Sequence, residues 1–258
     1  METKLSVVII TFNEEKNIGR CLESVKGLAD EILVVDSFST DKTKEICLSK
    51  GARFITHPFE DFTKQKNYAF SQASHDWILS LDADEALETV LKRNILELKK
   101  SPQPYAFKMH RVTQFCGKWI RKGEWYPDVK LRLVNRMESK FTGGKVHEQL
   151  TTTQKVKLLN GEILHYSFYT IDDYVLQNNK FSTLSAQTMH ESGKSTTILR
   201  VIVAPIFSFV KNYFFKGGFL EGYFGWVIAV NSAHGNFLKY AKLYTLNKLK
   251  KNNDNDNL

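Results

Sequence analysis

The first hundred residues alternate between short apolar runs and segments whose apolar positions recur every three or four residues. The run Leu5–Thr11 is rich in β-branched side chains, which favours a buried strand, and Ile18, Leu22 and Val25 follow at helical spacing. Further strands are expected at 31–35, 52–56 and 77–81, and further helices at 40–49, 62–73 and 87–99. This order predicts an α/β fold, a mostly parallel sheet with helices on both faces.

Polar clusters follow three of these strands. Residues 11–15, 36–41 and 82–85 each begin where an apolar run ends, so all three fall at the carboxyl ends of expected strands. Open α/β sheets bind their ligands at that edge. We therefore expect the three clusters to form one site.

The pattern changes after Pro102 and Pro104, which interrupt the chain. Strands are expected at 105–113, 130–134 and 155–159, a polar helix at 171–189, and strongly apolar segments at 201–210 and 224–230. The last residues are almost entirely Asn, Asp and Lys, which favours disorder. We expect a first domain at 1–165, a helical extension at 166–250, and a disordered tail at 251–258.

Composition excludes several classes of protein. Hydrophobic residues make up 42% and charged residues 25% of the 258 positions, which is typical of a globular protein. The net charge is +8, and residues 196–258 carry 8 basic but only 3 acidic side chains. A nearly balanced body with a basic end does not fit a general nucleic-acid binder. Three distant cysteines without a Cys-x-x-Cys pair argue against disulfides and a zinc site.

Targeting signals are not expected. A secretion signal needs a basic leader, a long apolar stretch and a cleavage site, and the first ten residues do not have all three. The sequence also has no run of about 18 uncharged apolar residues. These features predict a protein that is kept in the cytoplasm and does not span a membrane.

The third polar cluster, Asp82-Ala83-Asp84-Glu85, gathers carboxylates that repel one another if nothing lies between them. A hard divalent cation, Mg²⁺ or Mn²⁺, relieves such repulsion. Alternatively, the cluster opens a helix, since acidic side chains favour a first turn. Asp36 also has two interpretations: it accepts hydrogen bonds from a ribose or a base, or it caps a turn.

Four blocks occur in the order and spacing of a known family. They are Thr11-Phe12-Asn13-Glu14-Glu15, Val34-Val35-Asp36-Ser37-Phe38-Ser39-Thr40-Asp41, Gln65-Lys66-Asn67 and Asp82-Ala83-Asp84-Glu85. Over residues 4–170 the chain resembles the family 2 inverting glycosyltransferases, which have the GT-A fold. The resemblance implies an enzyme that binds a nucleotide-sugar.

The resemblance also assigns roles to residues. It implies that four side chains hold the base and ribose of the donor: Thr11, Asn13, Glu15 and Asp36. It further implies that Lys66 lies near the nucleotide, that Asp82 contacts the ribose or the sugar, and that Asp84 holds the metal that bridges the diphosphate.

A later segment supplies candidates for the chemical step. In similar enzymes an acidic residue near this position is the general base, which implies that Glu148 takes the proton of the acceptor hydroxyl. The family more often has an acidic pair where this chain has His147-Glu148, so His147 supports Glu148, contacts the diphosphate or packs. The candidates for diphosphate or acceptor contacts are Trp125, Asp128, Arg132, His147 and His165. For Trp125 and His165 a structural role is the alternative.

The carboxyl-terminal region predicts a contact with membranes. Its apolar segments are bordered by Arg200, Lys211 and Lys216, and it is rich in Phe and Tyr. Such segments lie in a membrane interface and are attracted by anionic headgroups. Helices packed on the first domain, or a dimer contact, produce the same pattern.

The segments 216–222 and 239–242 also resemble the ends of bacterial lipopolysaccharide-core glycosyltransferases. That resemblance implies transfer of a hexose, often glucose, from a UDP-sugar to a lipid-linked saccharide acceptor. It places the protein as a peripheral enzyme on the inner face of the cytoplasmic membrane. The alternatives are a glycosyltransferase with another polysaccharide or lipid-carrier acceptor, and a non-enzymatic, membrane-associated protein that binds nucleotide-sugars.

Other classes fit less well. A sugar-phosphate nucleotidylyltransferase opens with a Gly-rich phosphate loop, whereas Gly19 is the only glycine of the segment 11–19. A phosphatase of the aspartyl-phosphate type has its Asp-x-Asp after the first strand, and here it follows the fourth. A membrane adaptor explains the carboxyl-terminal region but gives the three acidic clusters no role.

Overall fold

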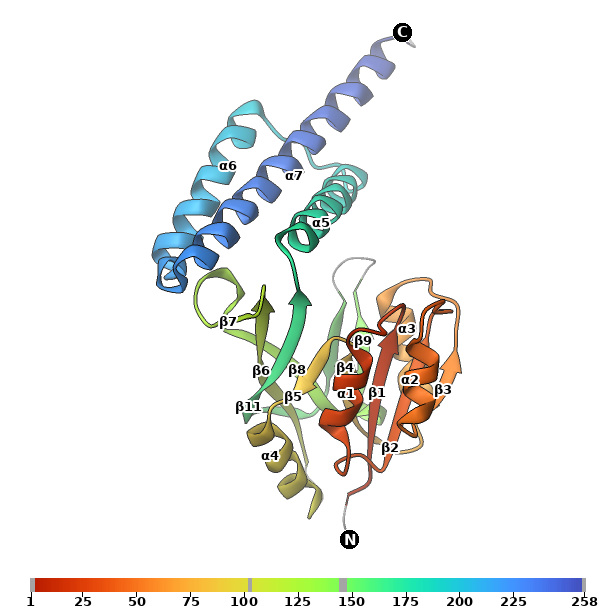
Figure 1. The fold of residues 1–258 in the computed structure, drawn as a ribbon. Helices are drawn as coiled ribbons and strands as arrows, with labels where there is room; N and C mark the ends of the chain where they lie inside the picture. The colour runs from red at the N-terminus through yellow and green to blue at the C-terminus, as the bar shows by residue number, and fades with distance from the viewer. Residues whose placement is uncertain (1–2, 102–103, 144–147, 257–258) are drawn as a thin grey trace. The chain divides into compact units, whose positions relative to one another are not determined.

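The computed structural model describes residues 3–101, 104–143 and 148–256. The first four strands are β1 (Leu5–Thr11), β2 (Glu31–Asp36), β3 (Arg53–Thr56) and β4 (Trp77–Asp82). They are parallel and lie in the order β3-β2-β1-β4 (Figure 1). Thr11 is in register with Asp36, and Ile10 with Asp82. The carboxyl ends of β2, β1 and β4 therefore meet at one edge, as the sequence predicts.

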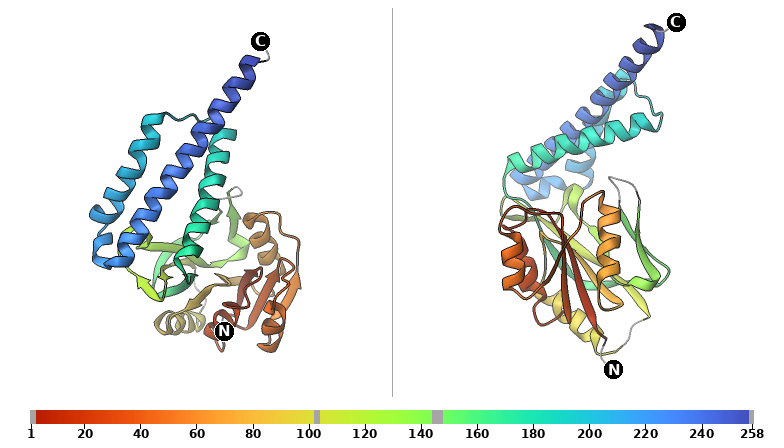
Figure 2. Two further views of the ribbon diagram at one scale, coloured as in Figure 1. Left: turned by 45° about the horizontal axis from the view of Figure 1, so that its top comes forward. Right: turned by 90° about the vertical axis from the view of Figure 1, so that its right-hand side faces the viewer.

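Helices cover both faces of this half of the sheet (Figure 2). They are α1 (Ile18–Val25), α2 (Thr43–Ser49), α3 (Phe62–Gln72) and α4 (Thr89–Lys99). Helices α1, α2 and α4 share one hydrophobic cluster with Val7 and Ile9 of β1, whereas α3 shares the other with Val8. Successive side chains of a strand point to opposite faces, so β1, apolar at nearly every position, is buried from both sides.

The rest of the sheet is antiparallel where its pairings are defined. Its strands are β5 (Glu85–Leu87), β6 (Tyr105–Phe115), β7 (Lys118–Ile120), β8 (Asp128–Asn135) and β11 (Lys155–Phe168). The order continues as β4-β8-β6-β11-β5, and β7 pairs with β6. Strand β8 is antiparallel to β4 and β6, and β5 to β11. The predicted α/β class is confirmed, with parallel pairing of β1 with β2, of β1 with β4 and of β2 with β3.

Smaller elements complete this region. Strands β9 (Ser139–Thr142) and β10 (Gln149–Thr152) form a separate antiparallel pair. Two short 3-10 helices, η1 (Gly123–Trp125) and η2 (Arg136–Glu138), flank β8 in the sequence.

The chain divides into two compact units. The first comprises Met1–Thr113 and Pro127–Ser167, and the second comprises Gln114–Tyr126 and Phe168–Leu258. The helical elements of the second unit are α5 (Ile171–Glu191), α6 (Ile198–Val210), the π-helical η3 (Lys211–Phe215), the 3-10 helix η4 (Gly218–Glu221) and α7 (Tyr223–Asp256). Because the sequence pattern shows only local burial, it assigns residues 114–126 to the first domain.

An aromatic core explains why residues 114–126 belong with the helices. Phe115 is fully buried, and its ring packs edge to face against those of Phe168 and Tyr174. The ring of Trp125 is 5.3 Å from that of Phe168 and 5.0 Å from that of Tyr174. A Thr170–Asp173 capping box begins α5 beside this core.

Several expected boundaries differ from the structure; the strand expected at 155–159, for example, continues to Phe168. The helix expected from residue 87 begins at Thr89, because Glu85–Leu87 pairs with β11 as a strand. The apolar segment 224–230 is the beginning of α7, a helix of 34 residues. Helix α7 continues to Asp256, so it contains most of the tail that the sequence predicts to be disordered.

Among the described residues, one helical stretch is long and apolar enough to cross a membrane, judged by length and composition alone. It is Ile198–Phe215, with a mean hydropathy of 1.5 and 17% of its residues buried. Arg200 and Lys211 fall inside it, so the criterion of an uncharged run misses it. The expectation that no uncharged apolar run of about 18 residues occurs still holds, and the expectation that the chain does not span a membrane stays a prediction.

Candidate active site

Side chains of the first two polar clusters tie two loops together at the carboxyl edge of the sheet. The Asn13 side chain accepts a hydrogen bond from the Thr40 backbone N–H at 2.9 Å, and the Asn13 N–H donates to the Ser39 hydroxyl at 2.8 Å. The Glu15 carboxylate accepts from the Lys42 N–H at 3.0 Å. These bonds hold the loop after β1 against the loop after β2.

Thr11 and Asp36 lie beneath these loops. Asp36 is only 2% exposed, and its carboxylate accepts hydrogen bonds from the backbone N–H and the hydroxyl of Ser39. The Thr11 hydroxyl is buried and has no hydrogen-bond partner among the described residues. The structure thus brings the four expected base and ribose residues together, but Asn13, Glu15 and Asp36 already bond within the protein. Their contacts with a donor stay predictions.

Asp82 lies between two cations at the end of β4. One carboxylate oxygen is 2.9 Å from Lys66 Nζ, and the other is 2.8 Å from Arg132 Nη2. Burial by itself raises the pKa of Asp82, but the guanidinium of Arg132 and the ammonium of Lys66 hold that pKa well below its usual range. Asp82 is therefore an ionised group, fixed in direction by Lys66 on α3 and Arg132 on β8.

A chain of ion pairs continues from Arg132 across the sheet. Its Nη2 also lies 2.6 Å from Glu85, a carboxylate with no exposed side-chain surface. Glu85 in turn pairs with Arg111 at 3.1 Å, and Arg111 pairs with Asp128 at 2.8 Å. Asp128 and Arg132, two expected diphosphate or acceptor contacts, thus belong to one charge network with Asp82.

Asp84 is paired with His165 rather than with a cation of this network. The Nε2 atom of His165 lies 3.1 Å from Asp84 Oδ2, and its Nδ1 atom lies 3.2 Å from the Thr113 hydroxyl. The backbone holds the pair as well, since the Tyr166 N–H donates to the Asp84 carbonyl at 2.9 Å. The two histidine contacts fix the ring with one nitrogen directed at Asp84.

Negative charge accumulates around Asp84. Burial raises the pKa of Glu14 on the neighbouring loop, and the charges of Asp84 and Asp82 raise it further, against a hydrogen bond from Asn17. The described residues contain no cluster of three His, Cys, Asp or Glu side chains placed to bind a metal.

Glu148 lies beside Lys66 and lines a cavity. Its Oε1 atom is 3.3 Å from Lys66 Nζ, the same ammonium that binds Asp82. A cavity of about 480 Å³ opens there. It is lined by Lys66, Asp82, Lys108, Arg111, Val129, Lys130, Leu131, Arg132, Phe141, Glu148, Gln149, Leu150 and Val156. The site thus has a carboxylate beside a space large enough for a substrate.

Two further candidates lie elsewhere. Trp125 belongs to the aromatic core of the second unit, so packing accounts for it, and its contact with an acceptor stays a prediction. His147 lies outside the described residues. The structure therefore adds nothing to the alternatives for its role.

Arg111 is a member of the site that the sequence patterns do not single out. It lies in the middle of β6, and its partners Asp128 and Glu85 are 17 and 26 positions away. A charged residue inside a strand pattern is the only local signal, because its partners depend on how β6 pairs with β8. The role of Glu85 as a buried partner of two arginines is equally non-local.

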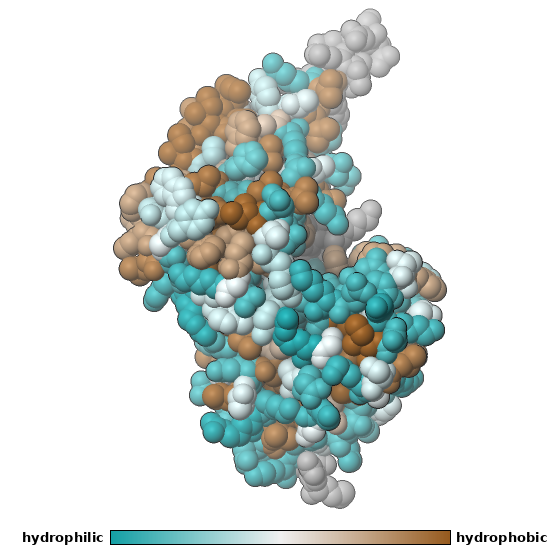
Figure 3. Space-filling view, in the orientation of Figure 1, coloured by the Kyte–Doolittle hydropathy of each residue, from teal (hydrophilic) through white to brown (hydrophobic). Residues whose placement is uncertain are grey.

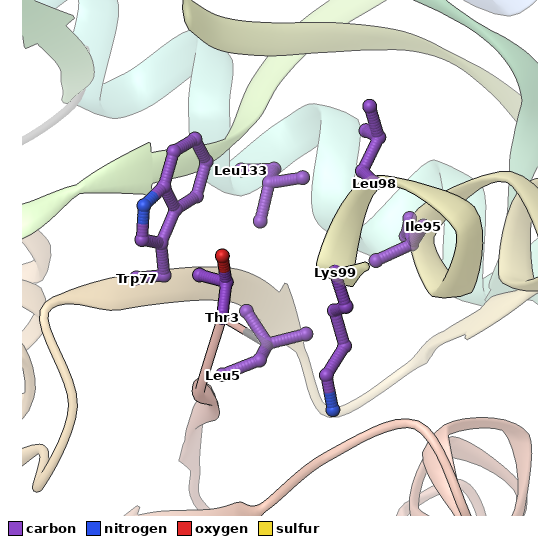
Figure 4. Close-up of a pocket in the computed structure, with 7 residues that line it drawn as sticks. All are labelled: Thr3, Leu5, Trp77, Ile95, Leu98, Lys99 and Leu133. Carbon is purple, nitrogen blue, oxygen red and sulfur yellow. The ribbon is translucent and has the colours of Figure 1, made fainter. Parts of the chain in front are cut away.

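A second cavity lies at the other end of the strands (Figure 4). It measures about 20 Å³ and is lined by Thr3, Leu5, Trp77, Ile95, Leu98, Lys99 and Leu133. Trp77 begins β4, so this space lies at the amino end of that strand. A volume of this size holds about one water molecule, and it is not a substrate site.

Comparison with known proteins defines the class of this site. Residues 6–181 match the model of glycosyl transferase family 2. The lipopolysaccharide core biosynthesis glycosyltransferase LpsC of Rhizobium meliloti is 33% identical, over 95% of this chain and 94% of that protein. An uncharacterized glycosyltransferase of Rickettsia typhi is 31% identical, over 96% of this chain and 89% of that protein. The chain belongs to glycosyl transferase family 2.

A solved structure gives a more distant likeness. Glucosyl-3-phosphoglycerate synthase from Mycobacterium tuberculosis, in complex with Mn²⁺, UDP and glucosyl-3-phosphoglycerate, is 22% identical to this chain. The match covers 43% of this chain and 44% of that chain, with a TM-score of 0.36.

Proposed function

We propose that this glycosyltransferase moves a hexose, probed first as glucose, from a UDP-sugar to a lipid-linked saccharide such as lipopolysaccharide inner core, with inversion at the anomeric carbon. The observation that carries the proposal is that Glu148 and Asp82 both pair with the ammonium of Lys66, and that all three residues line one cavity. The relative LpsC, named for lipopolysaccharide core biosynthesis, supports this class of acceptor. Another polysaccharide or a lipid carrier would suit the same chemistry.

The proposed reaction needs one proton acceptor. The acceptor hydroxyl attacks the anomeric carbon, the bond between that carbon and the phosphate oxygen breaks, and UDP leaves. Glu148 takes the proton of the hydroxyl as the new bond forms. Lys66 holds Glu148 and Asp82 in place, and Arg132 fixes Asp82 from the other side.

The residues around Asp84 fit a divalent cation, Mg²⁺ or Mn²⁺. Asp84 and His165 offer a carboxylate and an imidazole 3.1 Å apart. Mg²⁺ commonly binds one or two carboxylates together with substrate phosphates, and Asp84 supplies one such carboxylate. When bound, such an ion neutralises the charge that develops on the leaving diphosphate. Thr113 orients His165 for this role.

Thermal unfolding with UDP, GDP and CMP, each with Mn²⁺ or with EDTA, tests the donor site. We expect UDP with Mn²⁺ to raise the melting temperature by about 5–10 °C at 100 times its dissociation constant, and EDTA to remove most of that shift. GDP and CMP should give smaller shifts. If no nucleotide changes the melting temperature, the proposed donor is wrong, and a membrane-associated protein without transferase activity becomes the better description.

We also propose that α6 and η3 lie in the surface of a membrane. Among the described residues of α6 only Val201 is buried, while Ile202 is 56% and Ile206 is 60% exposed. Apolar side chains gather over this helix in the space-filling view (Figure 3). An exposed apolar surface of this extent marks an interaction site in a soluble protein.

The charges around this surface favour anionic lipid. Residues 192–220 contain no acidic side chain, whereas Arg200, Lys211 and Lys216 are all exposed. Each cation near an anionic leaflet contributes about 1 kcal/mol of attraction. Phe214 and Phe215 on η3 lie between two of these lysines and are 56% and 83% exposed. We propose peripheral attachment at the inner face of the cytoplasmic membrane, where nucleotide-sugars are available.

Vesicle binding tests the attachment. We expect the wild-type protein to sediment with vesicles of phosphatidylcholine and phosphatidylglycerol, and less with phosphatidylcholine alone. The double variant Ile202→Glu, Ile206→Glu should lose most of this binding, because two charges cannot enter the apolar interface. Leu48→Glu on α2, which removes an equally exposed leucine of the first unit, should bind like wild type. Equal sedimentation of all three proteins contradicts the proposal. Release of the protein from cell membranes by alkaline carbonate distinguishes attachment from spanning.

A further inference from the structure

Phe38 adopts a backbone conformation that its side chain disfavours. It lies in the loop after β2 with φ at 64°, the left-handed region, which bulky L-residues avoid. Packing does not compensate, since Phe38 is 56% exposed and its ring contacts no other aromatic ring among the described residues. Strained residues of this kind persist where the surrounding structure fixes them, and they cluster at ligand sites.

Hydrogen bonds on both sides of Phe38 fix it in this conformation. The Ser37 hydroxyl accepts from Gln65 Nε2 at 3.1 Å, which ties the preceding residue to α3. The Ser39 N–H donates to the Asp36 carboxylate at 2.8 Å, which closes the turn on the other side. The phenyl ring is therefore presented outward by bonds that its neighbours make.

Several polar groups of this edge already bond within the protein, and its large exposed hydrophobic side chains, Phe12 and Phe38, are aromatic. Asn13 and Glu15 bond across the two loops, and Asp36 is buried. Phe12, next to Asn13, is 57% exposed. Aromatic side chains on which bases stack are a general means of binding nucleotides, because every base has a flat π face. A hydrophobic ring kept in water at the cost of backbone strain needs such a partner.

We propose that the Phe38 ring forms one wall of the nucleobase site and that the strained loop holds it ready before the donor arrives. The inference rests on the proposed function, because it requires a nucleotide donor. Phe38 then contributes to the binding of the base, whereas other groups contact the diphosphate. Holding the ring in its bound position in advance lowers the ordering cost of binding.

Two variants of Phe38 separate the ring from the strain. Phe38→Ala removes the ring but keeps a side chain in the left-handed region, whereas Phe38→Gly removes both. We expect both variants to weaken UDP binding by about tenfold, the size of one lost stacking contact. Only Phe38→Gly should also raise the melting temperature, by about 2–4 °C, because glycine tolerates this φ.

The probes are UDP and inorganic pyrophosphate, each with Mn²⁺, measured by calorimetry on the full chain. Pyrophosphate has no base, so its affinity should be unchanged in both variants, and Phe181→Ala, which removes an exposed ring of α5, should bind UDP like wild type. If wild type binds UDP and both Phe38 variants bind it equally well, the inference is wrong while the proposed function stands. Equal losses for UDP and pyrophosphate also contradict it, since they indicate a collapsed loop. Absence of nucleotide binding by wild type overturns the proposed function and this inference together.

Discussion

Glu148→Gln should reduce the rate of sugar transfer by about 10²–10⁴-fold, the usual effect of losing a general base. The amide has nearly the shape of the carboxylate and keeps an oxygen that can accept a hydrogen bond from Lys66, but it cannot take the proton of the acceptor hydroxyl. The measurement is UDP release from UDP-glucose with truncated, inner-core lipopolysaccharide as acceptor. The affinity for UDP, measured separately, should stay within about twofold of wild type.

A matched control separates the role of Glu148 from a general loss of charge. Glu45→Gln changes an exposed glutamate on α2 and should leave the rate unchanged. Full transfer activity in Glu148→Gln would contradict the assignment of Glu148 as the general base. A parallel loss of UDP affinity would point to disruption of the ion pairs at Lys66 instead.

Asp84→Ala should abolish both the Mn²⁺-dependent stabilisation by UDP and the transfer activity. Removing the carboxylate leaves His165 as the one remaining protein group of the expected metal site. His165→Gln should have a smaller effect, about 10–100-fold in metal affinity or activity, because it removes a group that acts beside or behind the carboxylate. Titration of each variant with Mn²⁺ at saturating UDP measures its metal affinity and its transfer activity.

The order of these two effects is the informative result. Asp172→Asn, a change to an exposed aspartate on α5, serves as the control and should behave like wild type. A larger loss in His165→Gln than in Asp84→Ala would make the histidine the main ligand. Metal-independent activity that survives in Asp84→Ala would refute a role for Asp84 in metal binding.

Much of the site could be predicted from the sequence because its motifs are local. Strands β1, β2 and β4 are mostly apolar runs, and the polar residues that end them, such as Asp36 and Asp82, reach the same edge of a parallel sheet. The resemblance to family 2 glycosyltransferases added the expected roles. Most helix and strand positions in the first hundred residues could be predicted to within a few residues, since each depends on periodicity within one segment. The elements after residue 150 are longer than their local patterns indicate.

The partners of these residues could not be predicted in this way. Lys66 and Glu148 are 82 positions apart, and Asp84 and His165 are 81 apart. Each pair depends on which strands become neighbours and in what register, and a shift of one residue would turn a side chain to the other face. The aromatic core that places Trp125 with the helices depends equally on contacts between distant segments.

The sequence by itself therefore determined the class of fold, the edge at which the polar clusters gather and the family of enzyme, because these follow from local patterns and motif order. Only the tertiary structure decided that one ammonium holds Glu148 and Asp82, that His165 faces Asp84, and that α6 keeps its apolar side exposed. It also revealed the strained backbone of Phe38. The physical reason is that burial, charge pairing and backbone strain are properties of neighbours in space, and periodicity along the chain reports only neighbours in sequence.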